Sequence, residues 1–485
     1  MIHPTQKHLT RLACHGTAAC CLLWLSACAT TSSSGDSRAQ FDASLPTNWQ
    51  HETTATSTPG STDLSQCWSR FNDPQLEALI AEALEHNTDS RTALSNIRQA
   101  RAERGLESAE LWPSLSGSVS ASSANSRDRQ TNQSSSSESY GATLDASWEI
   151  DLFGQQQQYL KAADAELAAT TEDFYQLQVS LAAEVASTYL ELCSLQDQLA
   201  IVQQSLSNRL DTVELTQWLE DAGEGDALDT QQSISSAEQA RAQIPDLEQS
   251  IVETRNSLAI LTARTPESLS ELTSAATRFP QVPDAITIGI PAETLRQRPD
   301  IRAAERRIEA ATANLSASER SRLPSLNLSG SIGLEALSSG DLLDPQNILS
   351  NIAAGLSAPI WDAGRISRNI EIQQETLTQA YLSYESAVLN ALSEVENALS
   401  AIQKRNTQLT TLDKATTAAH QATELAQVQY ETGEIDLLTV LDTQRTELSL
   451  QQSRTSTQAQ LLNAHVQLYK SLGGAWNTPS EITQL

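Results

Sequence analysis

The sequence lacks the patterns that membrane-spanning helices and common enzymes require. No stretch approaches the ~18 consecutive apolar residues of a transmembrane helix, so strands would have to make any membrane crossing. H-E-x-x-H, G-x-S-x-G, P-loop and EF-hand patterns are all missing, and Gly223–Gly225 is a lone Gly-x-Gly. We therefore expect no enzymatic activity, no metal site and no bound cofactor.

Positive charge is also scarce. The chain has 31 Lys and Arg against 60 Asp and Glu, a net charge of −29. This balance argues against nucleic acid and anionic lipid as partners. A long run of charged residues, Arg302 to Glu309, is interpreted as a solvated helix face.

The N-terminus predicts a lipoprotein signal over residues 1–27. Basic residues precede a mostly apolar stretch, Ala18–Leu25, and Leu25–Cys28 fits a lipobox. Cys28 would then carry a covalent lipid such as palmitate, the only non-protein group expected, and residues 28–67 would be a lipid-anchored linker. Ala29 after the cysteine favours the outer membrane. The alternative is a plain secretory peptide that happens to contain Cys28.

Few cysteines would remain after that cleavage. Cys14, Cys20 and Cys21 would leave with the signal, so only Cys67 and Cys193 would accompany Cys28. The sequence therefore predicts no disulfide framework.

Proline is absent from two long segments, residues 114–244 and 360–478. In each segment one glycine precedes a helical pattern and another interrupts it 69 residues later: Gly154 and Gly223, then Gly364 and Gly433. A helix of that length spans roughly 100 Å, and its apolar residues recur every three or four positions as in a coiled coil. We predict helical hairpins over 155–262 and 365–472, with Gly223 and Gly433 as the breaks at their tips. A soluble helical bundle or fibre would show the same pattern.

The chain also repeats itself at an offset of 211 residues. Pro113–Leu115 recurs as Pro324–Leu326, and Asp151 recurs as Asp362. We infer a duplicated unit whose two halves fold alike. The first repeat is placed at 68–278, the second at 279–473, and a C-terminal tail at 474–485.

Each half contains a pair of predicted strands ahead of its helical hairpin. Apolar residues alternate with serines from Leu115 to Ala121, a polar stretch 122–139 reads as a loop, and alternation resumes over 140–148. The second half gives strands over 326–333 and 353–360. The strand pairs thus cover 114–148 and 325–360.

Four strands cannot close a barrel, and an open edge in lipid costs several kcal/mol per unpaired backbone group. Three chains would supply twelve strands, an even number typical of outer-membrane barrels. Trp112, Trp148, Phe153 and Trp361 flank the strand ends and fit an interfacial girdle. A core position is the alternative for any one of them.

Several motifs resemble the TolC-like outer membrane efflux proteins, and the lipobox resembles their lipoprotein, OprM/NodT-like branch. The motifs are Leu295–Ile301 (LRQRPDI), Leu323–Leu326 (LPSL), Ile244–Glu248 (IPDLE) and Gly433–Arg445 (GEIDLLTVLDTQR). The similarity covers roughly residues 68–473. Leu261–Arg264 departs from it, since relatives usually have Leu-Leu-Gly there.

The resemblance implies an α+β membrane protein: a trimeric twelve-stranded outer-membrane barrel continued by a long helical barrel in the periplasm. It also implies a homotrimer that works as the passive exit duct of a tripartite efflux system, with a periplasmic adaptor and an inner-membrane pump of the RND type. Leu438, Asp442 and Arg445 would form the periplasmic aperture; otherwise Leu438 is an ordinary seam residue and Asp442 a solvated one.

Two other classes of protein stay open. A lipid-anchored trimeric coiled-coil or adhesin protein of the cell envelope would share the helical seams. A periplasmic adaptor would share the anchor and a helical hairpin. Neither class needs two duplicated strand pairs.

Overall fold

The computed structural model describes residues 41, 46, 48–50, 67–127, 134–267, 279–283, 295–342 and 344–474. The chain divides into two units, Met1–Leu45 and Pro46–Leu485. Only Phe41 of the first unit is described, so the fold below is that of the second. The expected signal peptide, Cys28 and most of the linker and tail lie outside the described residues.

The second unit contains the expected duplication. Ahead of it lies a short 3-10 helix, η2 (Trp68–Phe71), and another, η3 (Pro345–Asn347), precedes the last strand. The elements of the first half are α3 (Pro74–His86), α4 (Thr88–Ala109), β1 (Ser114–Arg127), β2 (Ser134–Ile150), α5 (Gln155–Ala222) and α6 (Ala227–Leu261). Those of the second half are α9 (Pro299–Arg320), β3 (Ser325–Ala336), β4 (Ile348–Ser357), α10 (Arg365–Glu431) and α11 (Leu437–Ser471).

Equivalent residues start the long helix in each half. The Asp151 carboxylate accepts a hydrogen bond from the Gln157 amide (2.9 Å), and the Asp362 carboxylate accepts one from the Ile366 amide (2.8 Å). Gly154 and Gly364 precede the helices at φ of 75° and 84°, where a side chain would be strained. The same local chemistry therefore turns each strand pair into its helix.

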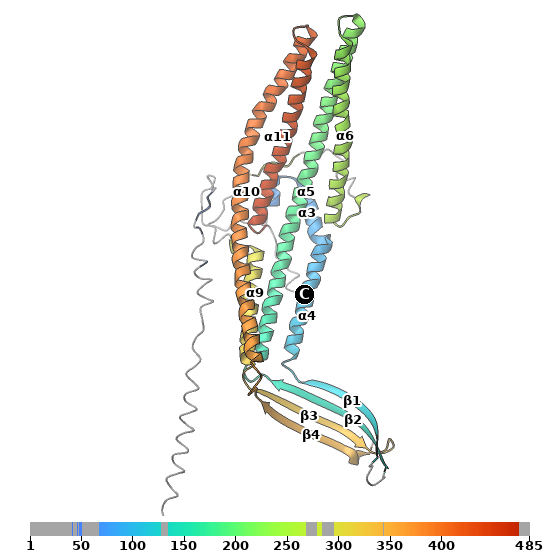
Figure 1. Cartoon of the computed structure of the whole chain (residues 1–485), viewed down its shortest axis with the longest axis vertical. Helices are drawn as coiled ribbons and strands as arrows, with labels where there is room; N and C mark the ends of the chain where they lie inside the picture. Colours follow the sequence, from blue (N-terminus) through green and yellow to red (C-terminus); the bar gives the residue numbers. More distant parts are fainter. Residues whose placement is uncertain are drawn as a thin grey trace, which may run out of the picture. The chain divides into compact units, whose positions relative to one another are not determined.

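The four strands form one antiparallel sheet in the order β1-β2-β3-β4 (Figure 1). The strands of the first pair are longer than predicted: Ser122 pairs with Ser139, and Arg127 pairs with Ser134. The polar stretch 122–139 is therefore mostly strand rather than loop. Serine has little intrinsic preference for strands, but the backbone ladder continues from the apolar residues beside it. In the second pair β4 begins and ends earlier than predicted, at Ile348 and Ser357.

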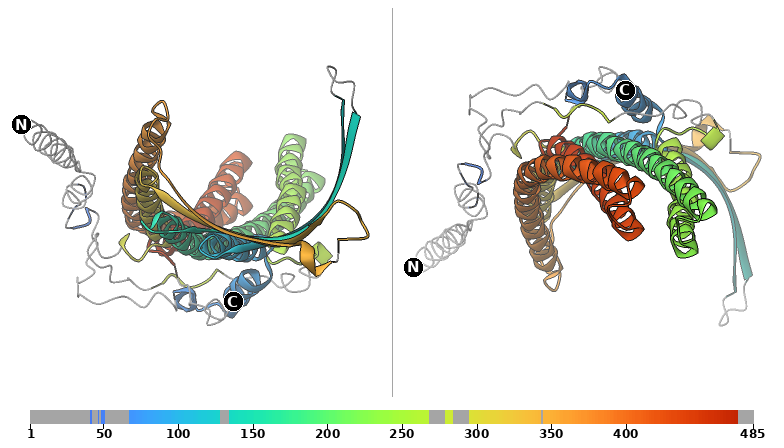
Figure 2. Two further views of the ribbon diagram at one scale, coloured as in Figure 1. Left: turned by 90° about the horizontal axis from the view of Figure 1, so that it is seen from below. Right: turned by 90° about the horizontal axis from the view of Figure 1, so that it is seen from above.

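The long helices lie side by side in a curved layer (Figure 2). In the half nearer the sheet the order is α4-α5-α9-α10, and toward the tips α6, α5, α11 and α10 are neighbours (Figure 1). The main hydrophobic core lies midway along α5, where α3 packs on the convex side of the layer (Figure 2). Tyr189 and Tyr469 are its largest fully buried side chains, and Phe71 joins them from η2. Among the residues described, no helix is long and apolar enough to cross a membrane.

Candidate functional site

The two faces of the sheet differ sharply in chemistry. Residues directly opposite one another across the strands share a face. One such row is apolar throughout: Val119, Ala142, Leu334 and Ile348. A row three residues further along, on the other face, is polar throughout: Ser116, Asp145, Ser331 and Asn351.

This alternation continues along the sheet. Leu115, Leu144, Ile332, Ile352 and Leu356 belong to the apolar face, and all are exposed in the single chain. The polar face carries hydrogen bonds between strands, such as Ser118 Oγ to Thr143 Oγ1 (2.8 Å). Where β1 and β2 extend past Ala121, both faces are polar apart from Ala124. A large exposed apolar face of this kind marks contact with lipid or protein.

Three of the four predicted interfacial aromatics are exposed and lie at the junction of sheet and helices. They are Trp112, Phe153 and Trp361, of which Trp361 is 88% exposed. Trp148 differs, because it is half-buried and its Nε1 donates a hydrogen bond to the Leu111 carbonyl oxygen (3.0 Å). Trp148 therefore also packs the sheet against the end of α4.

The two hairpins end in tight turns at the predicted glycines. Gly223 and Gly433 both have positive φ, 76° and 73°, and a Cβ atom at either position would meet open space, so the backbone angle rather than crowding favours glycine. Asp226 caps α6 by accepting the Leu228 amide, and Asp436 caps α11 by accepting the Thr439 amide. The breaks thus come from glycine and aspartate chemistry within each tip.

The predicted aperture residues share one exposed face of α11. Leu438 is 58% exposed, whereas Leu437 and Leu441 are buried. Asp442 and Arg445 are also exposed, with 3.9 Å between Asp442 Oδ1 and Arg445 Nη1. Leu438 therefore does not belong to the buried seam within the chain.

Charges on the two hairpins influence one another near the tips. Burial raises the pKa of Asp229 on α6, and the carboxylates of Asp226 and Asp436 raise it further. Burial also lowers the pKa of Arg209, and the positive charge of Arg445 lowers this pKa further. The α6 and α11 tips therefore lie close enough for like charges to repel.

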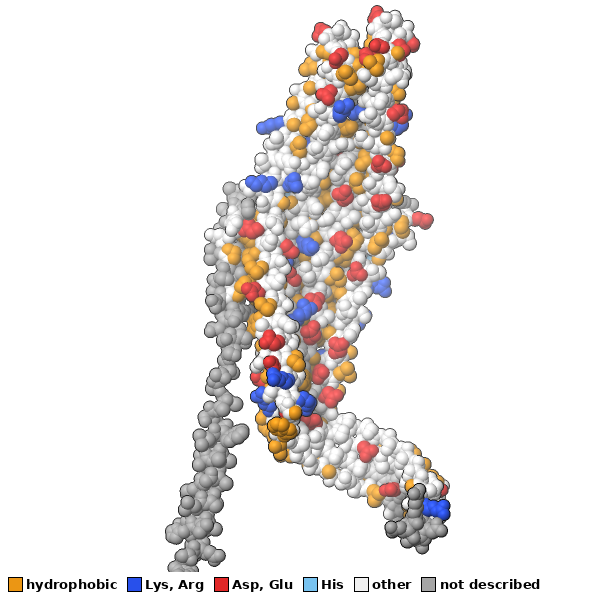
Figure 3. Space-filling view, in the orientation of Figure 1, with side chains coloured by type: hydrophobic (Ala, Val, Ile, Leu, Met, Phe, Trp, Pro, Cys, Tyr) orange, Lys and Arg blue, Asp and Glu red, His pale blue; other side chains and the backbone are white. Residues whose placement is uncertain are grey.

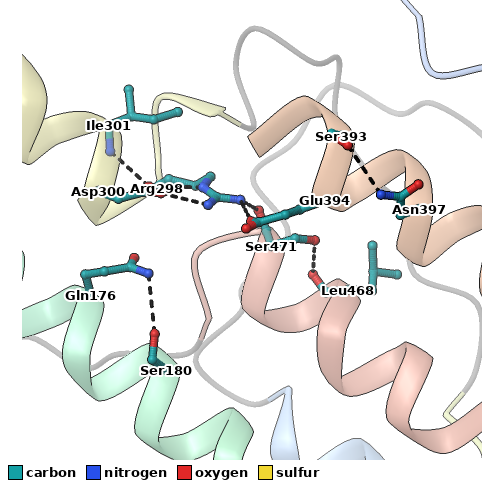
Figure 4. A network of polar contacts seen from close by, with 10 residues as sticks. All are labelled: Gln176, Ser180, Arg298, Asp300, Ile301, Ser393, Glu394, Asn397, Leu468 and Ser471. Atoms are coloured by element: carbon teal, nitrogen blue, oxygen red, sulfur yellow. Dashed lines mark hydrogen bonds and ion pairs between the residues drawn. The ribbon is translucent and has the colours of Figure 1, made fainter. Parts of the chain in front are cut away.

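Arg298 forms a cluster that its place in the Leu295–Ile301 motif did not reveal (Figure 4). The side chain is buried, yet it pairs with Asp300 (2.7 Å) and Glu394 (2.8 Å). Its Nη1 also donates to the Ser471 carbonyl oxygen (2.8 Å). Burial lowers the pKa of this guanidinium, but Asp300 and Glu394 outweigh burial and hold the pKa above its ordinary value. One side chain thus joins the start of α9, the middle of α10 and the end of α11.

The prediction of a solvated face over Arg302–Glu309 is wrong in part. Arg302 pairs with Glu172 on α5, and Arg307 pairs with Asp173. Glu172 is buried, which raises its pKa although the Arg302 charge opposes the shift. These charges hold α9 against α5, because one side of α9 faces a neighbouring helix rather than water.

Cys67 and Cys193 are both buried and form no disulfide. In the part of the chain that the structure describes, no group of three or more acidic, histidine or cysteine residues could hold a metal ion.

An amphipathic antiparallel sheet joined to two long helical hairpins is the protomer fold of TolC-like outer-membrane channels. The chain belongs to the outer membrane efflux protein family, whose model matches residues 79–264 and again 290–474. One match falls in each half of the chain. The family consists of passive outer-membrane efflux channels.

Individual relatives support this assignment. The pyoverdine export outer membrane protein OpmQ of Pseudomonas aeruginosa is 31% identical, over 94% of this chain and 96% of its own. The solved outer-membrane channel OprN is 31% identical with a TM-score of 0.80, covering 89% of this chain and 99% of its own. The open state of the Neisseria gonorrhoeae MtrE outer membrane channel is 28% identical with a TM-score of 0.78, covering 89% and 96%.

Proposed function

We propose that three copies of this chain close their sheets, edge to edge, into one twelve-stranded barrel that forms the outer-membrane exit of an efflux system. The observation that carries the proposal is the amphipathic sheet with its two open edges, β1 and β4. Pairing β1 of one copy with β4 of the next would satisfy the edge groups, each of which costs several kcal/mol when unpaired in lipid. The apolar rows would face lipid, and the polar rows would face water.

The barrel would continue into the periplasm as a duct lined by the concave side of the helical layer. Three such layers, each with α4 or α6 at one edge and α10 at the other, would complete a ring. The hairpin tips at Gly223 and Gly433 would then lie together at the far end. A periplasmic adaptor and an inner-membrane pump of the RND type would dock there and supply the energy.

The narrowest point of the duct would lie at the α11 tips. Three copies of Leu438 and Asp442 would surround the axis, since both residues are exposed on one face. The leucines would close the opening sterically, and the ring of carboxylates would favour cations. Arg445 would hold Asp442 in place with an exposed pair worth under ~1 kcal/mol.

The compounds that pass would be small organic molecules. OpmQ is named for pyoverdine export, and a Pseudomonas putida relative that is 29% identical is named a solvent efflux pump outer membrane protein. The choice among such compounds would be made by the pump. A lipid on Cys28 would tether the N-terminus to the membrane that already holds the barrel.

Single-channel recording tests this function. Purified full-length trimer added to a planar bilayer should give discrete current steps at constant voltage. An adhesin or an adaptor would give none. Trimers that insert into the bilayer without conducting under any voltage would contradict the proposal.

A further inference from the structure

A groove of about 380 Å³ lies on the helical layer, lined by residues of α4, α5 and α9. Its apolar surface includes Leu106, Tyr159 and Ala163, and its acidic residues are Glu103, Glu107 and Glu166. The small side chains of Ala162 and Ala163 on α5 form the floor of the groove, and residues of α4 and α9 form its walls. The volume lies within the ~300–1,000 Å³ typical of small-molecule sites.

The position of Tyr189 shows which side of the layer the groove opens on. The Tyr189 hydroxyl donates to Asp73 at the start of α3 (2.9 Å), so this side of α5 faces α3 and is convex (Figure 2). In a coiled coil, steps of seven residues stay on one side, and four such steps back from Tyr189 reach Lys161. Tyr159 and Ala163 are each two residues from Lys161, about 200° around the helix. They therefore face the concave side.

The charge of the groove is entirely negative. None of the residues that line it is basic, and the nearby Arg104 pairs with Asp164 (2.8 Å). Glu103 and Glu107 accept hydrogen bonds from Gln99 and Gln156 (both 2.9 Å), and these neutral amides leave the carboxylate charges in place. Figure 3, which views the concave side, shows other acidic side chains over this face, interspersed with Lys and Arg.

We propose that this groove is a weak binding site for amphiphilic organic cations on the wall of the duct, which rests on the function proposed above. Leu106 is 69% exposed and offers apolar surface to such a compound. The Tyr159 ring can stack on a flat cation, and the three carboxylates attract its charge. Weak binding suits a conduit, because a compound held tightly would not leave.

Ethidium, a flat aromatic cation, is a suitable probe for the full-length trimer in detergent at low salt. We expect saturable binding by fluorescence anisotropy, lost at high salt, and none for the anion fluorescein. Glu103→Gln with Glu166→Gln should weaken ethidium binding roughly tenfold, since two of the three carboxylates that attract the cation are neutralised. Ala163→Phe should fill the groove and weaken binding without changing any charge.

The matched control is Glu214→Gln with Glu253→Gln, which removes two exposed carboxylates far from the groove. Glu253 accepts from Gln249 (2.8 Å) just as Glu103 accepts from Gln99. Wild-type affinity in the groove variants, or equal loss in the control, would overturn the site. Bilayer current from the same samples separates this failure from failure of the duct, because a groove variant should still conduct.

Discussion

At the scale of single residues, neighbours in the sequence have opposite roles. Leu437 is buried in the hairpin, while Leu438 projects from it. Asp436 caps the same helix, whereas Asp442, six residues later, lies exposed beside Arg445. An aperture built from Leu438 and Asp442 is therefore available without loss of the packing that forms the hairpin.

Leu438→Ala together with Asp442→Ala should raise the unit conductance and admit larger antibiotics, because the obstruction and the charge ring are both removed. Planar-bilayer recording and susceptibility assays measure the two effects. Leu425→Ala, which also trims an exposed leucine but lies on α10 away from the turn, should leave conductance unchanged. If the double variant forms normal trimers that conduct as the wild type does, the aperture lies elsewhere.

Acylation at Cys28 is a second prediction at this scale. Radiolabelled palmitate should enter the wild-type protein but not Cys28→Ser. Cys67→Ser is the control, since Cys67 lies buried within the fold and should not affect labelling. We expect Cys28→Ser to keep some activity, because the barrel itself would hold the protein in the membrane. Equal label in all three proteins would contradict the lipobox.

At the scale of elements, polar contacts join helices beside their apolar seams. Arg298 ties α9 to α10 and α11. Between α10 and α11, His420 Nδ1 lies 2.7 Å from Glu447 Oε1. These three helices therefore depend on a few charges in addition to their apolar seams.

Arg298→Ala should destabilise the fold by ~1–3 kcal/mol, because the buried Ser471 carbonyl group loses its donor, whereas Asp300 and Glu394 keep contact with water. Denaturant unfolding followed by circular dichroism gives the change. Arg306→Ala is the control, since its pair with Glu309 is exposed and local, and should cost under ~1 kcal/mol. A similar small loss in both variants would show that the cluster is not structural.

Acid should weaken the fold through His465 on α11. Burial lowers the pKa of His465 to about 4, below the ~6.5 of an unfolded chain. The unfolded state therefore binds the proton first, and stability falls as the pH drops from ~6.5 toward 4, by up to ~3 kcal/mol. His465→Gln should lack this part of the pH dependence in melts recorded across that range.

His420 should make the fold more stable in acid, opposite to the effect of His465. Its hydrogen bond and ion pair with Glu447 raise its pKa, so its contribution is full below ~6.5 and is lost as the pH rises through the folded pKa. His420→Gln should therefore lose more stability in acid than at neutral pH. If the stability of the wild type and of both variants depended on pH in the same way, neither histidine would have the role described.

At the scale of the whole molecule, the duplicated halves give one sheet and one helical layer, each with open edges. The sheet is exposed on both faces, so it is incomplete as a single chain in either water or lipid. The concave side of the helical layer bears acidic groups (Figure 3). Assembly into a ring and insertion into the outer membrane would resolve all of these features together.

The orientation follows from that assembly. A cysteine at Ser135 should react with an impermeant maleimide on intact cells, since this exposed end of β2 extends past the apolar rows. A cysteine at Asp226, exposed at the α6 tip, should react only after the outer membrane is breached. Both cysteines should react in detergent, which controls for access. The reverse pattern would overturn the orientation.

Local patterns in the sequence determined the repeat, the element types and the turns. Gly223 and Gly433 end helices because their backbone angles favour glycine, and alternation along Leu115–Ala121 separates two faces because strands have a period of two. The loop predicted over Ser122–Ser139 is wrong where Ser122–Arg127 pairs with Ser134–Ser139, because pairing between strands overrides weak local preference. The tertiary structure alone placed the Arg298 cluster, the His420–Glu447 contact and the groove at Ala163. Those features join side chains far apart in the chain, and no local period encodes such distances.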